Sequence, residues 1–390
     1  MGVRGLGLKC LDSRLGLGEC KMALLAMEGF DYINAGTDMY GSSTSVAAPF
    51  YTVSGNNAAF TTGRSGVGRA MSLTNSTNGG TSNSFMYISP LANNPSEFVM
   101  GFAAYFQDSS NSAGDYRFIS VYDAAGANTQ FIIRSPVTAQ TSLGRCFELW
   151  NSANNTLLAT ATIPFYSSGN MWIYIELKCK IHPTTGYVEM RINGELALSK
   201  YNFNTNPSGT ANTCAAMAIF SSWRSTYLDD FYVLDTTGSA PFNDYLGPVY
   251  INKVLPTIDG SKTQFTLRSG ATTHYGEVDD DQSFDDDTTY VETNTTLNED
   301  LYKFATQSGT QLLAVKVLNR SKCTSFGNVK MGNIIEDYAG ANFQVQYGPL
   351  LTSSYYDSAA IFTTAPDGTT WDFTKLNATQ FGVKMKVGAS

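Results

Sequence analysis

Three carboxylate residues stand at alternate positions, the spacing that places side chains on one face of a β-strand: Glu277, Asp279 and Asp281. Two carboxylates about 5 Å apart on such a face can cleave a glycosidic bond, with one as nucleophile and the other as acid. These three, however, belong to an acidic, loop-like stretch. In the alternating segment around Glu176, the next two alternate positions are lysines, which cannot replace an acid. The sequence therefore predicts no catalytic role for these residues.

Carboxylates could also hold Ca²⁺, which prefers hard oxygen ligands. The adjacent Asp229 and Asp230 are one candidate pair, and an acidic loop offers six more ligands: Asp279, Asp280, Asp281, Asp285, Asp286 and Asp287. Neither group has the glycine that an EF-hand loop requires. Structural roles are the alternative: one aspartate of the pair would cap a turn while the other faces solvent, and the acidic loop would be solvated or face another subunit. Calcium is thus the only cofactor that we consider.

A sugar site needs an aromatic platform beside polar groups, since an indole or phenol face can stack on a pyranose ring. The loop SSWRSTY provides Trp223, Arg224 and Tyr227 in this combination. Packing of Trp223 beneath its own loop is the alternative. Because aromatic residues are also enriched at protein contacts, the loop fits either a glycan-binding or an assembly surface.

The elements that must position these residues are β-strands. In residues 171–181 the apolar side chains alternate with Trp172, Tyr174, Glu176 and two lysines, which is the period of a half-buried strand. A second alternating segment follows at residues 187–192, and the pair Asn193-Gly194 is typical of a tight hairpin turn. Residues 229–235 alternate again. Strand, turn and strand thus succeed one another without a helix.

Composition agrees with an all-β protein. The 390 residues suit roughly two domains, and the 35 glycines, 13% aromatic residues and 15% charged residues are typical of strands joined by many turns. Ten of the acidic residues lie between Glu277 and Asp300 without a lysine or arginine, which leaves the rest of the chain with 25 basic and 23 acidic residues. No basic stripe is present, so we expect no nucleic-acid partner. No apolar run approaches the ~20 residues of a membrane span.

The first 21 residues have no clear period and form either an N-terminal arm or an upstream extension. Residues Gly18, Glu19 and Cys20 can be encoded by a purine-rich stretch that looks like a ribosome-binding site. We therefore hypothesise that Met22 is the natural start. Mass spectrometry of the native protein would decide between the two.

An ordered series of short motifs resembles a known fold family. The segments EGFD, TTGRSGVGRAMSL, WIYIELK, TGYVEMRINGE and YLDDFYVLD follow one another between residues 28 and 235, and NDYLGPVY comes after them. This order is similar to that of the concanavalin A-like or laminin G-like jelly roll, in the version found in virion proteins of tailed bacteriophages. The resemblance implies an all-β jelly-roll sandwich over residues 22–243.

A stretch with two prolines and two glycines, residues 236–249, marks the domain boundary. Residues 244–390 then read as a second, smaller β-sandwich, with alternating segments at residues 313–317, 343–347 and 381–387. Only residues 371–380 fit a short helix. This part also resembles the C-terminal halves of phage structural proteins, which implies a role in virion assembly.

We therefore expect a non-enzymatic structural component of a bacteriophage virion, in the peripheral tail (fibre, baseplate or tip), with a possible host-surface glycan as ligand. Capsid decoration is one alternative, a carbohydrate-binding lectin another, and a glycoside hydrolase the least favoured. Expected partners are other virion proteins and further copies of the same chain, since virion parts are repeated by symmetry. The location implied is the virion, assembled in the host bacterial cytoplasm.

Overall fold

The computed structural model of the chain describes residues 23–32, 51–54, 58–74, 85–88, 94–107, 115–123, 128–136, 140–141, 144–165, 171–207, 211–221, 225–268, 270–281, 285–324 and 328–388. The first 21 residues, expected to be an N-terminal arm or an upstream extension, lie outside these residues. The described chain forms two compact units, residues 22–252 and residues 253–390, which we call the first and the second unit. The division falls later in the chain than the boundary expected after residue 243.

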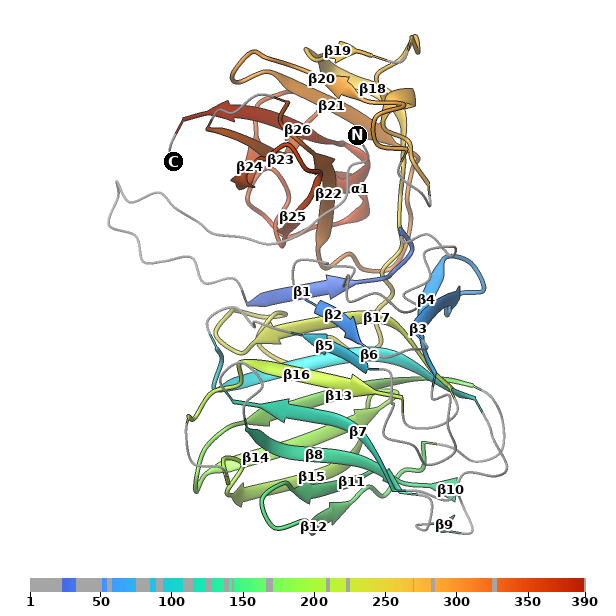
Figure 1. Cartoon of the computed structure of the whole chain (residues 1–390), viewed down its shortest axis with the longest axis vertical. Coiled ribbons are helices and arrows are strands. Elements are labelled where there is room, and N and C mark those ends of the chain that lie inside the picture. The colour runs from blue at the N-terminus through green and yellow to red at the C-terminus, as the bar shows by residue number, and fades with distance from the viewer. Residues whose placement is uncertain are drawn as a thin grey trace. The chain divides into compact units, whose positions relative to one another are not determined.

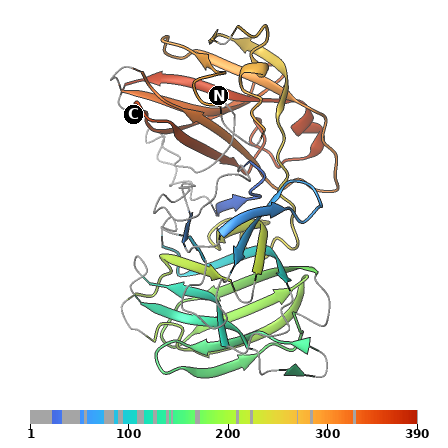
Figure 2. The same cartoon turned by 45° about the vertical axis from the view of Figure 1, so that its right-hand side comes forward.

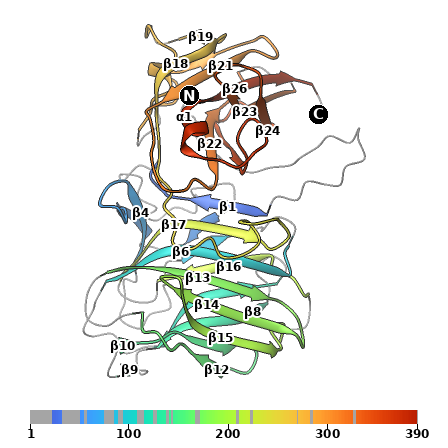
Figure 3. The same ribbon diagram turned by 180° about the vertical axis from the view of Figure 1, so that it is seen from behind.

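The first unit contains a large antiparallel sheet, which we call sheet I. Its strands run in the order β15 (Glu195–Phe203), β14 (Gly186–Ile192), β13 (Trp172–Lys180), β6 (Glu97–Gln107), β17 (Ser225–Asp235), β4 (Arg69–Thr74) and β3 (Ala58–Thr62), and β1 (Leu24–Glu28) also pairs with β17. Figure 3 shows β6, β13 and β14 of this sheet facing the viewer.

A second antiparallel sheet, sheet II, forms the other layer of the sandwich. Its order is β12 (Thr156–Thr160), β11 (Glu148–Asn151), β8 (Thr129–Pro136), β7 (Asp115–Tyr122), β16 (Ala216–Phe220), β5 (Phe85–Ile88) and β2 (Tyr51–Ser54). Strands β7, β8 and β16 lie in front in Figure 1. The short strands β9 (Gln140–Thr141) and β10 (Gly144–Arg145) pair with each other. The chain passes repeatedly from one sheet to the other, as in a jelly roll.

Aromatic side chains fill the space between the two sheets. Phe118 of β7 stacks on Phe147 at a centroid distance of 5.1 Å, and Phe147 stacks on Phe165 at 4.1 Å. The predicted inward face of residues 171–181 is confirmed from Ile173 to Ile181, where the alternate residues are buried in this core. Met171 is exposed, and Tyr174 and Glu176 of the opposite face are buried as well, so the strand is covered on both faces at its centre. The Asn193-Gly194 pair makes the predicted turn between β14 and β15, with positive φ at both residues.

The second unit is a smaller β-sandwich. Its five-stranded sheet, sheet III, has the order β18 (Pro256–Thr263), β21 (Glu299–Phe304), β26 (Thr379–Val387), β23 (Val329–Asp337) and β24 (Phe343–Leu350). The opposing layer is the pair β22 (Val315–Ser321) and β25 (Tyr356–Phe362), and β19 (Thr266–Leu267) pairs with β20 (Val291–Glu292). Side chains of β22, β25, β23 and β26 share one apolar cluster, which includes Val317, Phe362 and Phe381.

The fold class is therefore all-β, a larger sandwich followed by a smaller one, as predicted. One α-helix, α1 (Phe373–Asn377), is described, inside the segment that the sequence allowed for it, and it appears in red beside the strands of the second unit in Figure 2. A 3-10 turn, η2, spans Tyr275–Glu277. Among the described residues no helix is long and apolar enough to cross a membrane.

Candidate functional site

A row of three aromatic side chains crosses the outer face of sheet I. Trp172 of β13 stands directly opposite Tyr105 of β6, and Tyr105 stands opposite Tyr227 of β17. The rings of Tyr105 and Tyr227 are stacked, 5.2 Å between centroids and 4° between planes, and Trp172 lies 5.6 Å from Tyr105 at a tilt of 52°. All three are half-buried. We call them the aromatic row.

The aromatic row contains only one of the predicted sugar-site residues. Tyr227 belongs to it, whereas Trp223 and Arg224 lie outside the described residues. The sequence interpretation included neither Tyr105 nor Trp172 among the sugar-site residues. Strand alternation did place both on the outer face, but the pairing of β6 with β17 joins segments about 120 residues apart, which alternation cannot reveal.

The predicted calcium pair, Asp229 and Asp230, lies at a bulge in β17, where the register with β6 is interrupted. Asp230 has a positive φ of 50°. Asp229 accepts hydrogen bonds from the backbone N–H groups of Arg64 and Asp230, both at 2.8 Å. Asp230 accepts from Arg64 Nη1 at 3.1 Å and from the backbone N–H of Ile251 at 2.8 Å. The pair thus fastens the turn between β3 and β4 to sheet I.

The expectation that one aspartate of this pair faces solvent is wrong. Asp229 is 5% exposed and Asp230 3% exposed. Burial raises the pKa of Asp229, and the neighbouring charge of Asp230 raises it further. Burial also raises the pKa of Asp230, against the opposing effects of the Ile251 N–H and of Arg64. Asp31, whose side chain accepts from the Arg69 backbone N–H at 2.7 Å, adds a third negative charge nearby.

This arrangement predicts a pH-dependent stability of the first unit. The raised pKa values, about 8 for Asp229 and about 6 for Asp230, mean that the folded state binds more protons than the unfolded chain between pH ~4 and pH ~8. The stabilising contribution is complete below this window and is lost as pH rises through it. Asp229→Asn should make the free energy of unfolding of the first unit less sensitive to pH, by up to about 4 kcal/mol between pH 5 and pH 9, with a correspondingly flatter pH dependence of the melting temperature. Differential scanning calorimetry of both proteins at these pH values checks this, and equal slopes would contradict it.

A segment of the first unit's own chain, residues 244–251, covers the centre of the outer face of sheet I, and we call it the strap. Asp244 pairs with Lys178 Nζ at 3.1 Å. The backbone N–H of Gly247 donates to Glu176 Oε1 at 2.8 Å, and the carbonyl of Val249 accepts from Arg64 Nη1 at 3.0 Å. Together with the Ile251 contact described above, these bonds fix the strap along its length.

Glu176, the one acid of the predicted strand that could have acted in catalysis, lies beneath the strap and is 1% exposed. Its Oε1 accepts from Tyr232 Oη at 2.6 Å as well as from the strap. Burial raises the pKa of its carboxyl, while the Tyr232 hydroxyl and the Gly247 N–H oppose the shift. Directly opposite stands Arg191, which packs 3.9 Å from the centroid of the Tyr245 ring. Glu176 therefore anchors the strap.

The alternating acids Glu277, Asp279 and Asp281 do not form a strand face. Glu277 ends the η2 turn and is fully buried, and its carboxylate accepts from the backbone N–H groups of Ala271 at 3.2 Å and Tyr290 at 2.9 Å. Asp279 and Asp281 follow in irregular structure and are exposed. Glu277 thus holds two loops together.

Most of the remaining acidic loop is tied to basic residues of the second unit. Arg320 binds Asp286 through Nε at 2.5 Å and Nη2 at 2.9 Å. Asp287 pairs with Lys322 and accepts from the hydroxyl of Tyr355 at 3.0 Å. Of the other aspartates in the loop, Asp281 pairs with Lys253, and Asp285 accepts hydrogen bonds from the backbone N–H and the hydroxyl of Thr289.

Calcium binding stays a prediction at both places. Within the described ranges, no group of three or more His, Cys, Asp or Glu side chains could hold a metal ion. All four carboxylate oxygens of Asp229 and Asp230 already accept hydrogen bonds from the protein. A calcium-dependent rise in melting temperature would identify a site despite these contacts.

Comparison with known proteins gives fold-level likenesses only. No protein-family model and no curated protein sequence matches the chain. Among solved structures, the alginate lyase Aly36B is 14% identical, with a TM-score of 0.36 over 52% of this chain and 95% of that one. A carbohydrate esterase from the Shiga toxin-encoding bacteriophage phi24B is 13% identical, with a TM-score of 0.34 over 54% and 100%. A Bacillus subtilis protein of galectin-like fold is 11% identical, with a TM-score of 0.34 over 55% and 97%. At these identities and TM-scores, the likenesses identify neither a substrate nor an activity.

Proposed function

We propose that this protein is a non-enzymatic virion component of a tailed bacteriophage whose first unit binds a host-surface glycan. The observation that carries glycan binding is the aromatic row on the outer face of sheet I. Its three rings come from adjacent strands, so the sheet holds them in fixed register. The strap covers the neighbouring part of this face around Glu176, and the aromatic row beside it is the proposed ligand surface.

The chemistry of the aromatic row suits a sugar. Tyrosine and tryptophan combine an apolar ring, which packs on the C–H face of a pyranose, with a polar group that can bond to hydroxyls. Half-burial fixes the rings before binding, so little side-chain entropy is lost when a ligand arrives. Trp223 and Arg224, close before β17 in the sequence, remain predicted members of the same site.

The test is binding to a glycan array with matched variants. Tyr227→Ala should reduce binding about tenfold or more, because it removes one ring and the partner on which Tyr105 stacks. Trp223→Ala tests the sequence prediction separately. Tyr201→Ala is the control, since Tyr201 is an exposed tyrosine on β15, away from the aromatic row. A flat array for the unmodified protein, or equal binding by Tyr227→Ala and Tyr201→Ala, would refute the glycan site.

The place in the virion is a separate proposal, supported by the motif resemblance over both units. We favour the peripheral tail, where glycan adhesion would act on the host, over capsid decoration. A free lectin would show the same array binding without a virion location. Imaging purified particles with an antibody against this chain distinguishes tail from head, and particles without label would exclude both.

A glycoside hydrolase is not supported, because Glu277 and Glu176 each hold a loop in place. We expect no release of reducing ends.

A further inference from the structure

The outer face of sheet III, on the side away from β22 and β25, carries a cluster of lysines. Lys330 of β23 stands directly opposite Lys386 of β26, and Lys384 lies two residues before Lys386 on the same strand, opposite Gly332. The inward neighbours of these residues, Met331 and Met385, belong to the apolar core, so strand alternation places the three lysines on the outer face. We call Lys330, Lys384 and Lys386 the lysine cluster.

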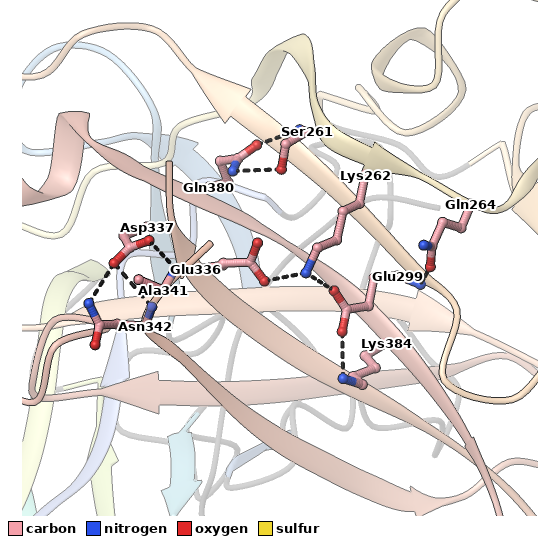
Figure 4. Close-up of polar contacts among 10 residues, drawn as sticks. All are labelled: Ser261, Lys262, Gln264, Glu299, Glu336, Asp337, Ala341, Asn342, Gln380 and Lys384. Carbon is pink, nitrogen blue, oxygen red and sulfur yellow. Dashed lines mark hydrogen bonds and ion pairs between the residues drawn. The ribbon is translucent and has the colours of Figure 1, made fainter. Parts of the chain in front are cut away.

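Acidic side chains of the second unit itself neutralise only part of the positive charge on this face. The register of β18 with β21 is interrupted between Asp259 and Thr263, and the intervening residues fold over the sheet. Lys262 from this bulge pairs with Glu299 at 2.5 Å and with Glu336 at 2.6 Å, and Lys384 also pairs with Glu299 at 2.5 Å (Figure 4). Ser261 and Gln380 exchange two hydrogen bonds beside them. The two glutamates are thus shared between two lysines.

The positive charges of Lys330 and Lys386, which stand opposite each other, are not neutralised by glutamates in this way. Like charges directly opposite on neighbouring strands are destabilising. In the described part of the second unit neither lysine forms an ion pair. Unfavourable pairs of this kind occur mainly at functional positions, where a binding partner supplies the missing interaction. The geometry therefore points to a negatively charged partner.

Exposed apolar groups adjoin the lysine cluster on the same face. Leu350 of β24 stands opposite Lys330 and is 50% exposed, and Phe343 of the same strand is 56% exposed. Lys384 lies 5.3 Å from the centroid of Phe343, and Lys386 lies 5.3 Å from that of Tyr347. Aromatic side chains with cations over them, beside aliphatic groups, have the composition of a protein interface. The partner is therefore a protein surface.

We propose that this face binds the acidic loop of a second copy of this chain. The acidic loop, residues 279–287, contains six aspartates and no lysine or arginine. Asp279 is exposed, and the side chains of Asp281 and Asp287 are 61% and 69% exposed even though each pairs with a lysine of its own unit. The lysine cluster and the acidic loop thus have complementary charge and occupy different parts of the second unit.

A contact between two different patches of identical chains is heterologous, and it closes into a ring when the rotation permits. This inference rests on the assembly role under the proposed function and is independent of the glycan site. It predicts that the pure, full-length protein self-associates and that salt weakens the association, since exposed charges are screened.

Sedimentation velocity at about 0.05 M and about 0.5 M NaCl measures this association. The double variant Lys330→Glu/Lys386→Glu should weaken it about tenfold or more, because acids would then face acids. Asp279→Lys/Asp281→Lys should do the same from the other side. An equimolar mixture of the two variants should associate again, because each then offers the other a complementary surface. Lys180→Glu/Lys200→Glu in the first unit changes the net charge equally and serves as control.

Circular dichroism confirms that each variant is folded before it is compared. The proposal is overturned if the unmodified protein stays monomeric at low salt, if the lysine-cluster variant associates like the control, or if the mixture of folded variants fails to associate. If this variant instead loses only binding to heparin, the occupant is a polyanionic glycan and the proposed contact between copies is wrong. Virion labelling is measured independently, so failure here leaves the proposed location standing.

Discussion

Replacing Arg64 with alanine is expected to lower the free energy of unfolding of the first unit by about 3–5 kcal/mol, because it removes one partner of a buried ion pair. The Arg64 side chain is 13% exposed and that of Asp230 4% exposed. Arg64 also lies 4.2 Å from the ring centroid of Tyr250 and donates to the Val249 carbonyl. The variant would leave buried negative charge without a cation and would loosen one end of the strap.

Guanidinium chloride denaturation at pH 5 and pH 8.5 measures this loss. We expect a smaller loss at pH 5, because the pKa of Asp230 is raised and protonation removes part of the unpaired charge. Arg64→Lys keeps a cation and is the matched control, with a cost between those of the unmodified protein and Arg64→Ala. A loss below about 1 kcal/mol at pH 8.5 would mean that the pair does not hold the β3–β4 turn.

In the second unit the largest expected effect belongs to Trp371. Trp371→Ala should cost about 3–5 kcal/mol, since it empties a large part of the apolar cluster between β22–β25 and sheet III. The indole is 5% exposed, stacks 6.4 Å from Phe381 between centroids, and donates from Nε1 to the Phe362 carbonyl at 2.8 Å. Trp371→Phe retains the ring packing but loses the hydrogen bond, so it should cost clearly less.

Calorimetry of the full chain separates this prediction from the first. Trp371→Ala should shift the transition of the second unit, whereas Arg64→Ala should shift that of the first, because the contacts described above for each residue belong to its own unit. Equal melting curves for Trp371→Ala and the unmodified protein would show that this cluster does not stabilise the second unit.

The sequence predicts well what depends on neighbouring residues. The alternation of residues 171–181, the Asn193-Gly194 hairpin and the helix within residues 371–380 all follow from local patterns, and all three occur in the structure. Each is decided by side-chain period or backbone preference over a few positions.

What the sequence could not predict depends on strand order and burial. The aromatic row exists because β17 returns beside β6, so Tyr227 reaches Tyr105 only through long-range pairing. Burial of Asp230 requires Arg64 and Ile251, which come from distant segments. Charged residues are almost never fully buried without partners, so a pattern that lacks the partners favours the surface.

The strap also sets where the first unit ends as an independently folding piece. A fragment of residues 22–243 would lose the Gly247 N–H that Glu176 accepts and the Ile251 N–H that Asp230 accepts. Both carboxylates would lose a bond on which their burial depends, and the face of Tyr232 beneath the strap would be uncovered. Prolines and glycines therefore mark the place where the chain leaves β17, whereas the folding boundary lies after Asn252. Fragments for expression or crystallisation should extend to that residue, because a shorter piece would expose surface prone to aggregation.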